Sequence, residues 1–94
     1  MKFTFTNDRP IYLQLVEQLQ IYIVSGKIPP GGKLPSVRDL SLQAKVNPNT
    51  MQRALSELET DKLIFTERTN GKYVTTNLRQ IKKIQDRFLR LKIT

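Results

Sequence analysis

The 94-residue sequence contains no cysteine and no histidine. Without cysteine, neither a disulfide nor a thiolate-bound metal can hold the fold together, and without histidine the most common general base and metal ligand are missing. No apolar run approaches the roughly 18–20 residues that a membrane-spanning helix needs. The N-terminal stretch MKFTFTNDRP also lacks the continuous apolar run and cleavage pattern of a signal peptide. We therefore expect a soluble, cytoplasmic chain with a single small core.

Recognisable enzyme signatures are absent as well. The sequence has no glycine-rich phosphate loop, no zinc-protease motif and no nucleophile elbow. Its carboxylates are scattered along the chain, and most of them fall in predicted helices with cations nearby, which is typical of solvated helix surfaces. We expect no catalytic residues, no metal ion and no cofactor.

Basic residues are in excess, and the excess is uneven. Sixteen Lys and Arg residues stand against eight Asp and Glu residues, which gives a net charge of +8. Residues 1–26 sum to zero, residues 27–76 to +3 and residues 77–94 to +5. A basic excess favours polyanionic partners such as nucleic acid or an anionic lipid surface, and charge alone does not choose between them.

Residues 10–25 show the first strong helical pattern. Apolar side chains recur there at four-residue spacing, which predicts an amphipathic helix. Pro10 suits the first turn of this helix and Gly26 suits the position just after its end. The apolar repeat is formed by Ile11, Leu15, Leu19 and Ile23.

Two shorter helices are expected next, joined by a tight turn. Ser36 and Asp39 form a capping-box-like pair at the start of the second helix, which ends at about Lys45. Asn47 caps the third helix, and Pro48 takes its first position. A connection this short makes the two helices cross steeply, as in a helix-turn-helix unit, although an ordinary helical hairpin has similar spacing.

The third helix keeps polar side chains on its exposed first turn. A helix fits the major groove of DNA, and its N-terminal residues reach the base edges. Amide side chains suit adenine and arginine suits guanine, whereas a solvated helix surface is the plainer explanation of the same residues. The exposed polar residues of this turn are Asn49, Thr50, Gln52 and Arg53.

A β-hairpin is predicted directly after the third helix. The stretch LIFTERTNGKYVTT holds two β-prone runs joined by Asn70-Gly71, the strongest short signal for a two-residue type I′ turn. Arg68 and Lys72 flank this tip, although polar tips are common for solvation alone. A helix-turn-helix followed by a hairpin is the winged-helix arrangement, which favours the nucleic-acid interpretation.

The C-terminal segment NLRQIKKIQDRFLRLKIT predicts a helix capped by Asn77. Its apolar stripe has the spacing of two short heptads, too few to hold a coiled coil unaided. The stripe must dock on its own domain or on the same helix of a second copy, and a membrane-surface helix would lay it among lipid headgroups. We favour the second copy, because a two-fold DNA reader needs one. The predicted dimerisation residues are Ile81, Ile84, Phe88 and Leu91.

Residues 10–74 resemble the N-terminal DNA-binding domain of the GntR family of bacterial transcription regulators, and most of all its short YtrA-like branch. The matching stretches are PIY, PPGGKLPSVRDL, VNPNTMQRALSELE and RTNGKYV, in this order and spacing. The resemblance implies a winged helix-turn-helix that binds operator DNA as a homodimer. It also implies a DNA contact at Arg38 and a wing that enters the minor groove at Gly71 and Lys72.

Three features depart from the family pattern. Lys45 stands in the inter-helix turn where glycine is frequent, so we expect a left-handed backbone on a non-glycine residue. Thr69 stands where the wing usually has glycine. Residues 77–94 are too few for the large effector-binding domain of the longer branches, so sensing of a small-molecule effector by a dedicated pocket is not expected.

These inferences combine into one prediction. The fold is mainly α with a small β-hairpin: a winged helix-turn-helix over residues 1–76 and a C-terminal dimerisation helix over residues 77–94. The function is sequence-specific binding of double-stranded DNA by a homodimer that represses transcription, with no membrane partner. The alternatives are a protein-interaction winged helix and a nonspecific architectural DNA binder. Among the predicted DNA contacts, Lys33, Arg38 and Thr50 suit phosphates. The full predicted set is Lys33, Arg38, Asn49, Thr50, Gln52, Arg53, Arg68, Gly71 and Lys72.

Overall fold

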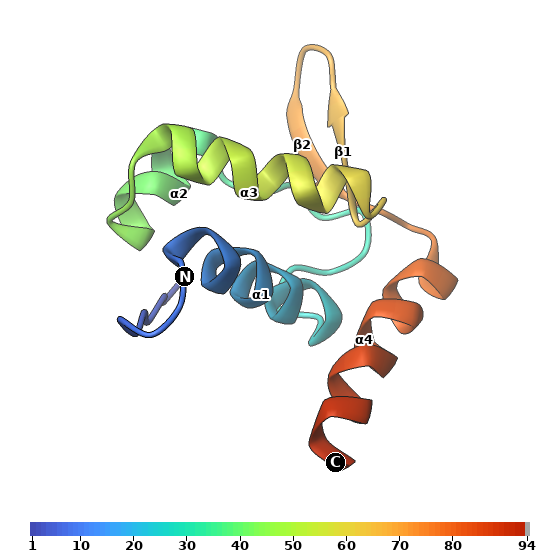
Figure 1. Ribbon diagram of the computed structural model, residues 1–94. Coiled ribbons are helices and arrows are strands. Elements are labelled where there is room, and N and C mark those ends of the chain that lie inside the picture. Colours follow the sequence, from blue (N-terminus) through green and yellow to red (C-terminus); the bar gives the residue numbers. More distant parts are fainter. Residues whose placement is uncertain (94) are drawn as a thin grey trace.

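Four helices and one β-hairpin follow one another in the computed structural model, which describes residues 1–93 and the side chains of residues 1–89 (Figure 1). Helices α1, α2 and α3 pack together, the hairpin projects beyond α3, and α4 lies beside the C-terminal end of α1. The predicted fold, mainly α with a small hairpin, is confirmed. The elements are α1 (Ile11–Val24), α2 (Val37–Ala44), α3 (Pro48–Thr60), β1 (Ile64–Glu67), β2 (Gly71–Val74) and α4 (Leu78–Ile93).

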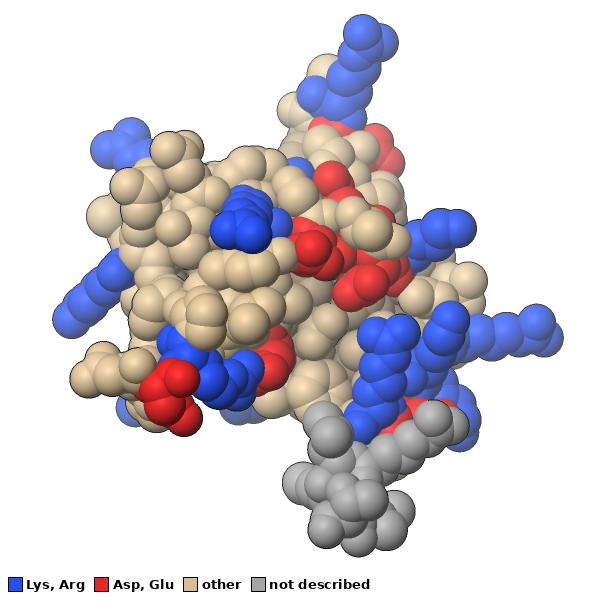
Figure 2. Space-filling view, in the orientation of Figure 1, with Lys and Arg blue, Asp and Glu red and all other residues tan. Residues whose placement is uncertain are grey.

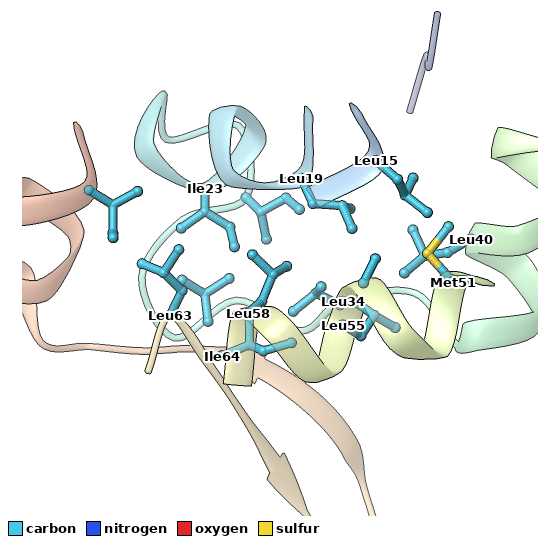
Figure 3. Close-up of a cluster of buried hydrophobic side chains, with 14 of the residues drawn as sticks. Leu15, Leu19, Ile23, Leu34, Leu40, Met51, Leu55, Leu58, Leu63 and Ile64 are labelled. Carbon is cyan, nitrogen blue, oxygen red and sulfur yellow. The ribbon is translucent and has the colours of Figure 1, made fainter. Parts of the chain in front are cut away.

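The core lies between α1 and α3, and α2 closes one end of it (Figure 3). Three residues of the repeat in α1 are turned inward and at most 1% exposed, Leu15, Leu19 and Ile23, whereas Ile11 at its start is 38% exposed. Burying one such side chain contributes about 1.5–3 kcal/mol, so the stripe fixes α1 on α3. At the other end, Leu63 and Ile64 carry the core into the base of the hairpin. The buried side chains of α1 and α3 include Leu15, Leu19, Ile23, Met51, Leu55 and Leu58.

The helix-turn-helix unit has the predicted caps. The Ser36 Oγ accepts a hydrogen bond from the Asp39 N–H at the start of α2 (3.1 Å). The Asn47 Oδ1 accepts one from the Asn49 N–H at the start of α3 (2.8 Å). Between the helices, Lys45 has the expected left-handed backbone, with φ 56° and ψ 45°. This conformation turns the chain sharply enough for α3 to begin three residues later.

The hairpin, which forms the wing, has a different turn from the predicted one. The Asn70 N–H donates to the Glu67 carbonyl oxygen (3.3 Å), and Glu67 is paired with Gly71. Within the hairpin only Gly71 has a positive φ, +105°, whereas a type I′ turn needs positive φ at both Asn70 and Gly71. The prediction of a type I′ turn centred on these two residues is wrong.

Core burial explains the observed register of the wing. Ile64 is 3% exposed and Val74 is fully buried, and the two residues are paired across the strands. A two-residue turn at Asn70-Gly71 would instead set Val74 opposite Glu67 and leave the two apolar residues unpaired. The other edge of β2 is also used, because Tyr73 forms a bridge with Lys33.

Helix α4 begins at the predicted cap and docks on its own domain. The Asn77 Oδ1 accepts hydrogen bonds from the N–H groups of Arg79 (3.1 Å) and Gln80 (3.3 Å). Ile81 is 9% exposed and Ile84 is 1% exposed, both in the core that α4 shares with α1. These two predicted dimerisation residues are therefore occupied within the chain and unavailable to a second copy in this arrangement. The apolar stripe found its partner on α1, which was the alternative not favoured from sequence.

The other two predicted dimerisation residues lie farther along α4. Phe88 is half-buried and packs against the same core. The side chain of Leu91 lies outside the described part of the structure. Among the described residues, no helix combines the length and the apolar character that crossing a bilayer would require.

Residues 1–6 follow α1 in an extended path that helical periodicity does not predict. The Thr6 N–H donates to the Gln14 Oε1 (2.8 Å), and the Gln14 Nε2 donates to the Thr6 carbonyl oxygen (2.9 Å). Thr4 and Gln18 form the same pair of bonds, at 3.0 and 2.7 Å. The repeat works because two residues of a strand advance about 6.6–6.8 Å and four residues of a helix about 6.0 Å. We call these paired bonds the N-terminal ladder.

Candidate nucleic-acid interface

Two open grooves flank α2. The first lies between the wing and the segment that leads into α2, and it contains Lys33, Gly71 and Lys72. The second lies beside the turn between α2 and α3, and it contains Arg38 and Lys45. The fold thus brings four of the sequence-predicted DNA-binding residues to the two sides of one short helix.

The first turn of α3 presents polar side chains to solvent. The buried stripe of α3 sets the rotation of the helix, and the cap at Asn47 and Pro48 sets where it begins. Asn49 and Gln52 are exposed and Thr50 is half-buried. Backbone N–H groups at a helix N-terminus favour an anion nearby, so this end of α3 suits a phosphate as well as base edges.

Arg53 is exposed, but its guanidinium lies on α1. The guanidinium carbon is 4.0 Å from the centroid of the Tyr12 ring, a cation–π contact. Burial raises the pKa of the Tyr12 hydroxyl, and the nearby Glu57 carboxylate raises it further. Arg53 and Tyr12 therefore join α3 to α1. The structure places this sequence-predicted reader in a contact within the protein.

The tip of the wing is exposed. Arg68 and Asn70 are exposed in the loop between β1 and β2, and this loop is the uppermost part of the molecule in Figure 1. Gly71 follows them with a φ of +105°, a backbone conformation that side-chain-bearing residues rarely adopt. A cation at this tip can reach a DNA groove that the body of the domain does not approach.

Lys72 is held against α3 rather than offered to solvent. Its Nζ lies 3.2 Å from the Glu59 Oε1 and donates to the Thr66 Oγ1 (2.9 Å). The Thr66 hydroxyl donates in turn to the same Glu59 oxygen. The Lys72 side chain is only 15% exposed. The sequence predicted this lysine as a DNA contact, and the structure places its ammonium in a bond network with α3.

Charge is divided along the recognition face. Figure 2 shows basic side chains at the wing tip and along α4, and acidic side chains around the C-terminal half of α3. One of these acids is Glu59, whose pKa is lowered by the hydrogen bond from Thr66 and then by Lys72. Polyanions are therefore favoured at the N-terminal end of α3 and disfavoured at its other end.

Several residues of this region carried no signal in the sequence. Tyr12, Glu59 and Thr66 are not among the site residues predicted from the sequence. Each is polar and falls at an ordinary position of a helix or strand, so only the packing of α1 and the wing on α3 reveals its partner. In the described part of the chain, no group of three or more Asp, Glu, His or Cys residues lies close enough to hold a metal ion.

A helix-turn-helix with an exposed polar first turn on its second helix, followed by a two-stranded wing, defines the winged-helix class of DNA-binding domains. Within that class, the sequence pattern described as "Bacterial regulatory proteins, gntR family" matches residues 11–74. The chain belongs to this family. It is a DNA-binding transcription regulator and not an enzyme.

Two relatives from Bacillus subtilis illustrate the similarity. The chain is 38% identical over 86 residues to the uncharacterized HTH-type transcriptional regulator YhcF, an alignment that covers 92% of the chain and 71% of YhcF. It is 41% identical over 71 residues to the HTH-type transcriptional repressor YtrA, covering 76% of the chain and 55% of YtrA. The chain thus spans little more than half the length of YtrA.

Solved structures agree with the fold. A GntR family transcriptional regulator from Listeria monocytogenes superposes with a TM-score of 0.90 at 39% identity, covering 95% of this chain and 78% of that one. The DNA-binding domain of AraR in complex with operator ORX1 superposes with a TM-score of 0.73 at 26% identity, covering 80% of this chain and 96% of that one. The second structure is a domain of this fold on DNA.

Proposed function

We propose that the chain binds a specific, roughly palindromic operator as a homodimer and represses transcription from it. One observation carries the proposal: the first turn of α3 exposes amide side chains between two basic flanks. Arg38 provides the flank at α2 and Arg68 the flank at the wing tip. A nonspecific binder needs the basic flanks but has no use for exposed amides on the helix that enters the groove.

Base reading falls to the first turn of α3. Asn49 and Gln52 each carry an amide that can donate a hydrogen bond to N7 of adenine and accept one from its N6 amino group. Both are exposed, and both lie within the first two turns of the helix, where a recognition helix reaches the base edges. Arg53 joins this set only if its guanidinium leaves Tyr12 when DNA binds.

Backbone contacts surround this reading turn. Lys33 and Arg38 are exposed in the two grooves beside α2, and Thr50 lies at the N-terminal end of α3. Contacts of this kind fix the register of a protein on the duplex without reading sequence. The wing tip, with Arg68 and Gly71, takes the adjacent minor groove, where a cation is attracted by the negative potential.

A homodimer would place two α3 helices in successive major grooves about 34 Å apart. The distal half of α4 is the segment we assign to the dimer contact, because α4 runs past the end of α1 in Figure 1. Phe88 lies in this half and is only half-buried by its own chain. Leu91 follows it on the same stripe of the sequence. Repression is proposed by similarity to YtrA, which is named a repressor.

The proposed operator binding is tested by fluorescence anisotropy at physiological salt with excess competitor DNA. One duplex is the promoter region upstream of the gene for this chain, because such regulators often control themselves, and the other is its scrambled counterpart. We expect a preference of about a thousandfold or more. Equal, steeply salt-dependent binding to both would favour an architectural binder, and no binding to either would favour a protein-interaction domain.

The proposed dimer is tested by sedimentation of a Phe88→Glu variant. We expect the variant to sediment as a monomer and the unmodified chain as a dimer. Ile84→Glu is unsuitable for this purpose, because Ile84 is 1% exposed and a buried charge there would unfold the domain. Leu42→Glu is the control, since Leu42 is 68% exposed on α2. A Phe88→Glu variant that remains folded and dimeric would place the interface elsewhere.

A further inference from the structure

Glu59 is an acid at the edge of a surface proposed to bind a polyanion. It lies on α3 seven residues after Gln52, so the two side chains fall on the same edge of the helix. Its side chain is 33% exposed. By charge alone, an acid in this place weakens binding to DNA, which means that its presence needs another physical reason.

The contacts of Glu59 supply that reason. Its Oε1 accepts from the Thr66 hydroxyl of β1 and from the Lys72 ammonium of β2, and Lys72 also donates to Thr66. One carboxylate of α3 therefore holds both strands of the wing. The base of the wing is fixed separately, by the buried pair Ile64 and Val74 and by main-chain bonds of β2 to residues 31–34, whereas this network links the side chains of both strands to α3.

The wing is otherwise a slender element. A two-stranded hairpin is marginal by itself in water, and from β1 onward its side chains toward the tip are largely exposed. Arg68 lies two residues beyond Thr66 in the exposed tip, so its position depends on how Thr66 and Lys72 are held. Binding of Arg68 in a defined place needs these two residues to be fixed.

We propose that Glu59 is a positioning residue, which fixes the wing relative to α3 through Thr66 and Lys72 and so delivers Arg68 to its place on the DNA. This inference rests on the proposed operator binding. It also gives Lys72 a structural role in place of the DNA contact predicted from sequence.

Charge and positioning predict opposite signs for the loss of Glu59. If the acid acts only through its charge, Glu59→Ala tightens DNA binding, because a negative charge is removed and Lys72 is released toward the phosphates. If Glu59 positions the wing, the same variant binds roughly three- to tenfold more weakly, and never more weakly than Arg68→Ala. Glu67→Ala is the matched control: it removes an exposed acid from the same wing, and we expect it to tighten binding.

A double-mutant cycle separates positioning from general destabilisation. If Glu59 acts through Arg68, adding Glu59→Ala to an Arg68→Ala protein changes the operator affinity by less than about twofold. A loss of the same size in both backgrounds would overturn the proposal, as would tighter binding by Glu59→Ala alone. Thermal unfolding of each variant confirms that the domain is folded at the temperature of the binding measurement.

A measurement without DNA distinguishes failure of this inference from failure of the proposed function. Because the chain contains no cysteine, Ser56→Cys and Thr69→Cys place two spin labels, one on α3 and one at the wing tip. We expect a narrow distance distribution that broadens or shifts on Glu59→Ala. An unchanged distribution would overturn the inference whatever the DNA results, and a chain that binds no duplex would overturn the proposed function together with the role of the wing in it.

Discussion

The two ends of α3 use similar polar side chains in opposite ways. At its N-terminal end, Asn49 and Gln52 are directed to solvent from a capped and fixed first turn. In its C-terminal half, Glu57 lies near Tyr12 of α1, and Glu59 is bonded to both strands of the wing. The N-terminal end of α3 is open to a partner, whereas the C-terminal half fixes the helix to its neighbours. A base contact at the N-terminal end needs a helix that cannot rotate, and the contacts of the C-terminal half provide this rigidity.

Removing the core between the two ends should have the largest effect, since it loosens both. Leu55 is fully buried between α1 and α3. Leu55→Ala should lower the free energy of unfolding by about 2–5 kcal/mol, through lost burial and the cavity that remains. Urea denaturation followed by circular dichroism measures this change. Leu42→Ala, at a position 68% exposed, should stay within about 0.5 kcal/mol of the unmodified chain.

The exposed N-terminal end of α3 can be tested without disturbing the contacts of its C-terminal half. Gln52→Ala should cost about 1–3 kcal/mol of operator binding and should relax the preference at one base pair. Anisotropy with duplexes altered one base pair at a time measures both effects. Gln85→Ala on α4 removes the same amide elsewhere and should leave the affinity unchanged. An equal loss on every duplex would mean that Gln52 does not read a base.

The contact of Arg53 with Tyr12 sharpens the comparison, because Arg53 lies between the two ends. If the stack holds α3 on α1, Arg53→Ala and Tyr12→Leu should show a coupling of about 0.5–1 kcal/mol in the free energy of unfolding. Thermal or urea unfolding of the two single variants and the double variant gives this number. Strictly additive effects on the free energy of unfolding, together with a relaxed preference at one base pair for Arg53→Ala, would instead assign Arg53 to base recognition.

The smallest expected effect is the pH dependence of the stability that Glu59 contributes at the C-terminal end of α3. The pKa of Glu59 is lowered in the folded protein, first by Thr66 and then by Lys72. A lowered folded pKa gives stability that is present above the unfolded value of about 4.3 and is lost as pH falls through the folded value. The stability difference between the unmodified chain and Glu59→Gln should therefore shrink below about pH 4.3. A difference that is constant from pH 7 to pH 3, measured by urea unfolding, would contradict this account.

Local signals predicted much of the fold from sequence. Ser36, Asn47 and Asn77 cap their helices as expected, because a cap is formed by residues within three positions of each other. The left-handed backbone at Lys45 followed from the resemblance to the family, in which glycine is frequent at this position. Such features depend on neighbouring residues, so the order of residues alone is enough to find them.

Features that depend on distant packing were not predicted. The wing turn at Asn70-Gly71 was wrong because burial of Ile64 and Val74 outweighs the local preference for a type I′ turn. Ile84 was assigned to a dimer because an apolar stripe shows that a helix docks but not on what. Lys72 looked like a free cation because Glu59 is thirteen residues away in sequence. The polar composition of the first turn of α3 could be recognised in the sequence, whereas the contacts that fix its C-terminal half could not.

The N-terminal ladder has a consequence for how freely this sequence can vary. Gln14 and Gln18 bond to main-chain atoms of residues 4, 6 and 9, apart from one contact of Gln14 with the Thr6 hydroxyl. Main-chain N–H and C=O groups are common to almost every amino acid, so substitutions at the outward-facing positions of residues 1–6 leave these hydrogen bonds intact. A substitution of Gln14 or Gln18 removes them. The position of residues 1–6 is thus determined by Gln14 and Gln18 of α1, and the outward-facing side chains of these residues can change without loss of the bonds.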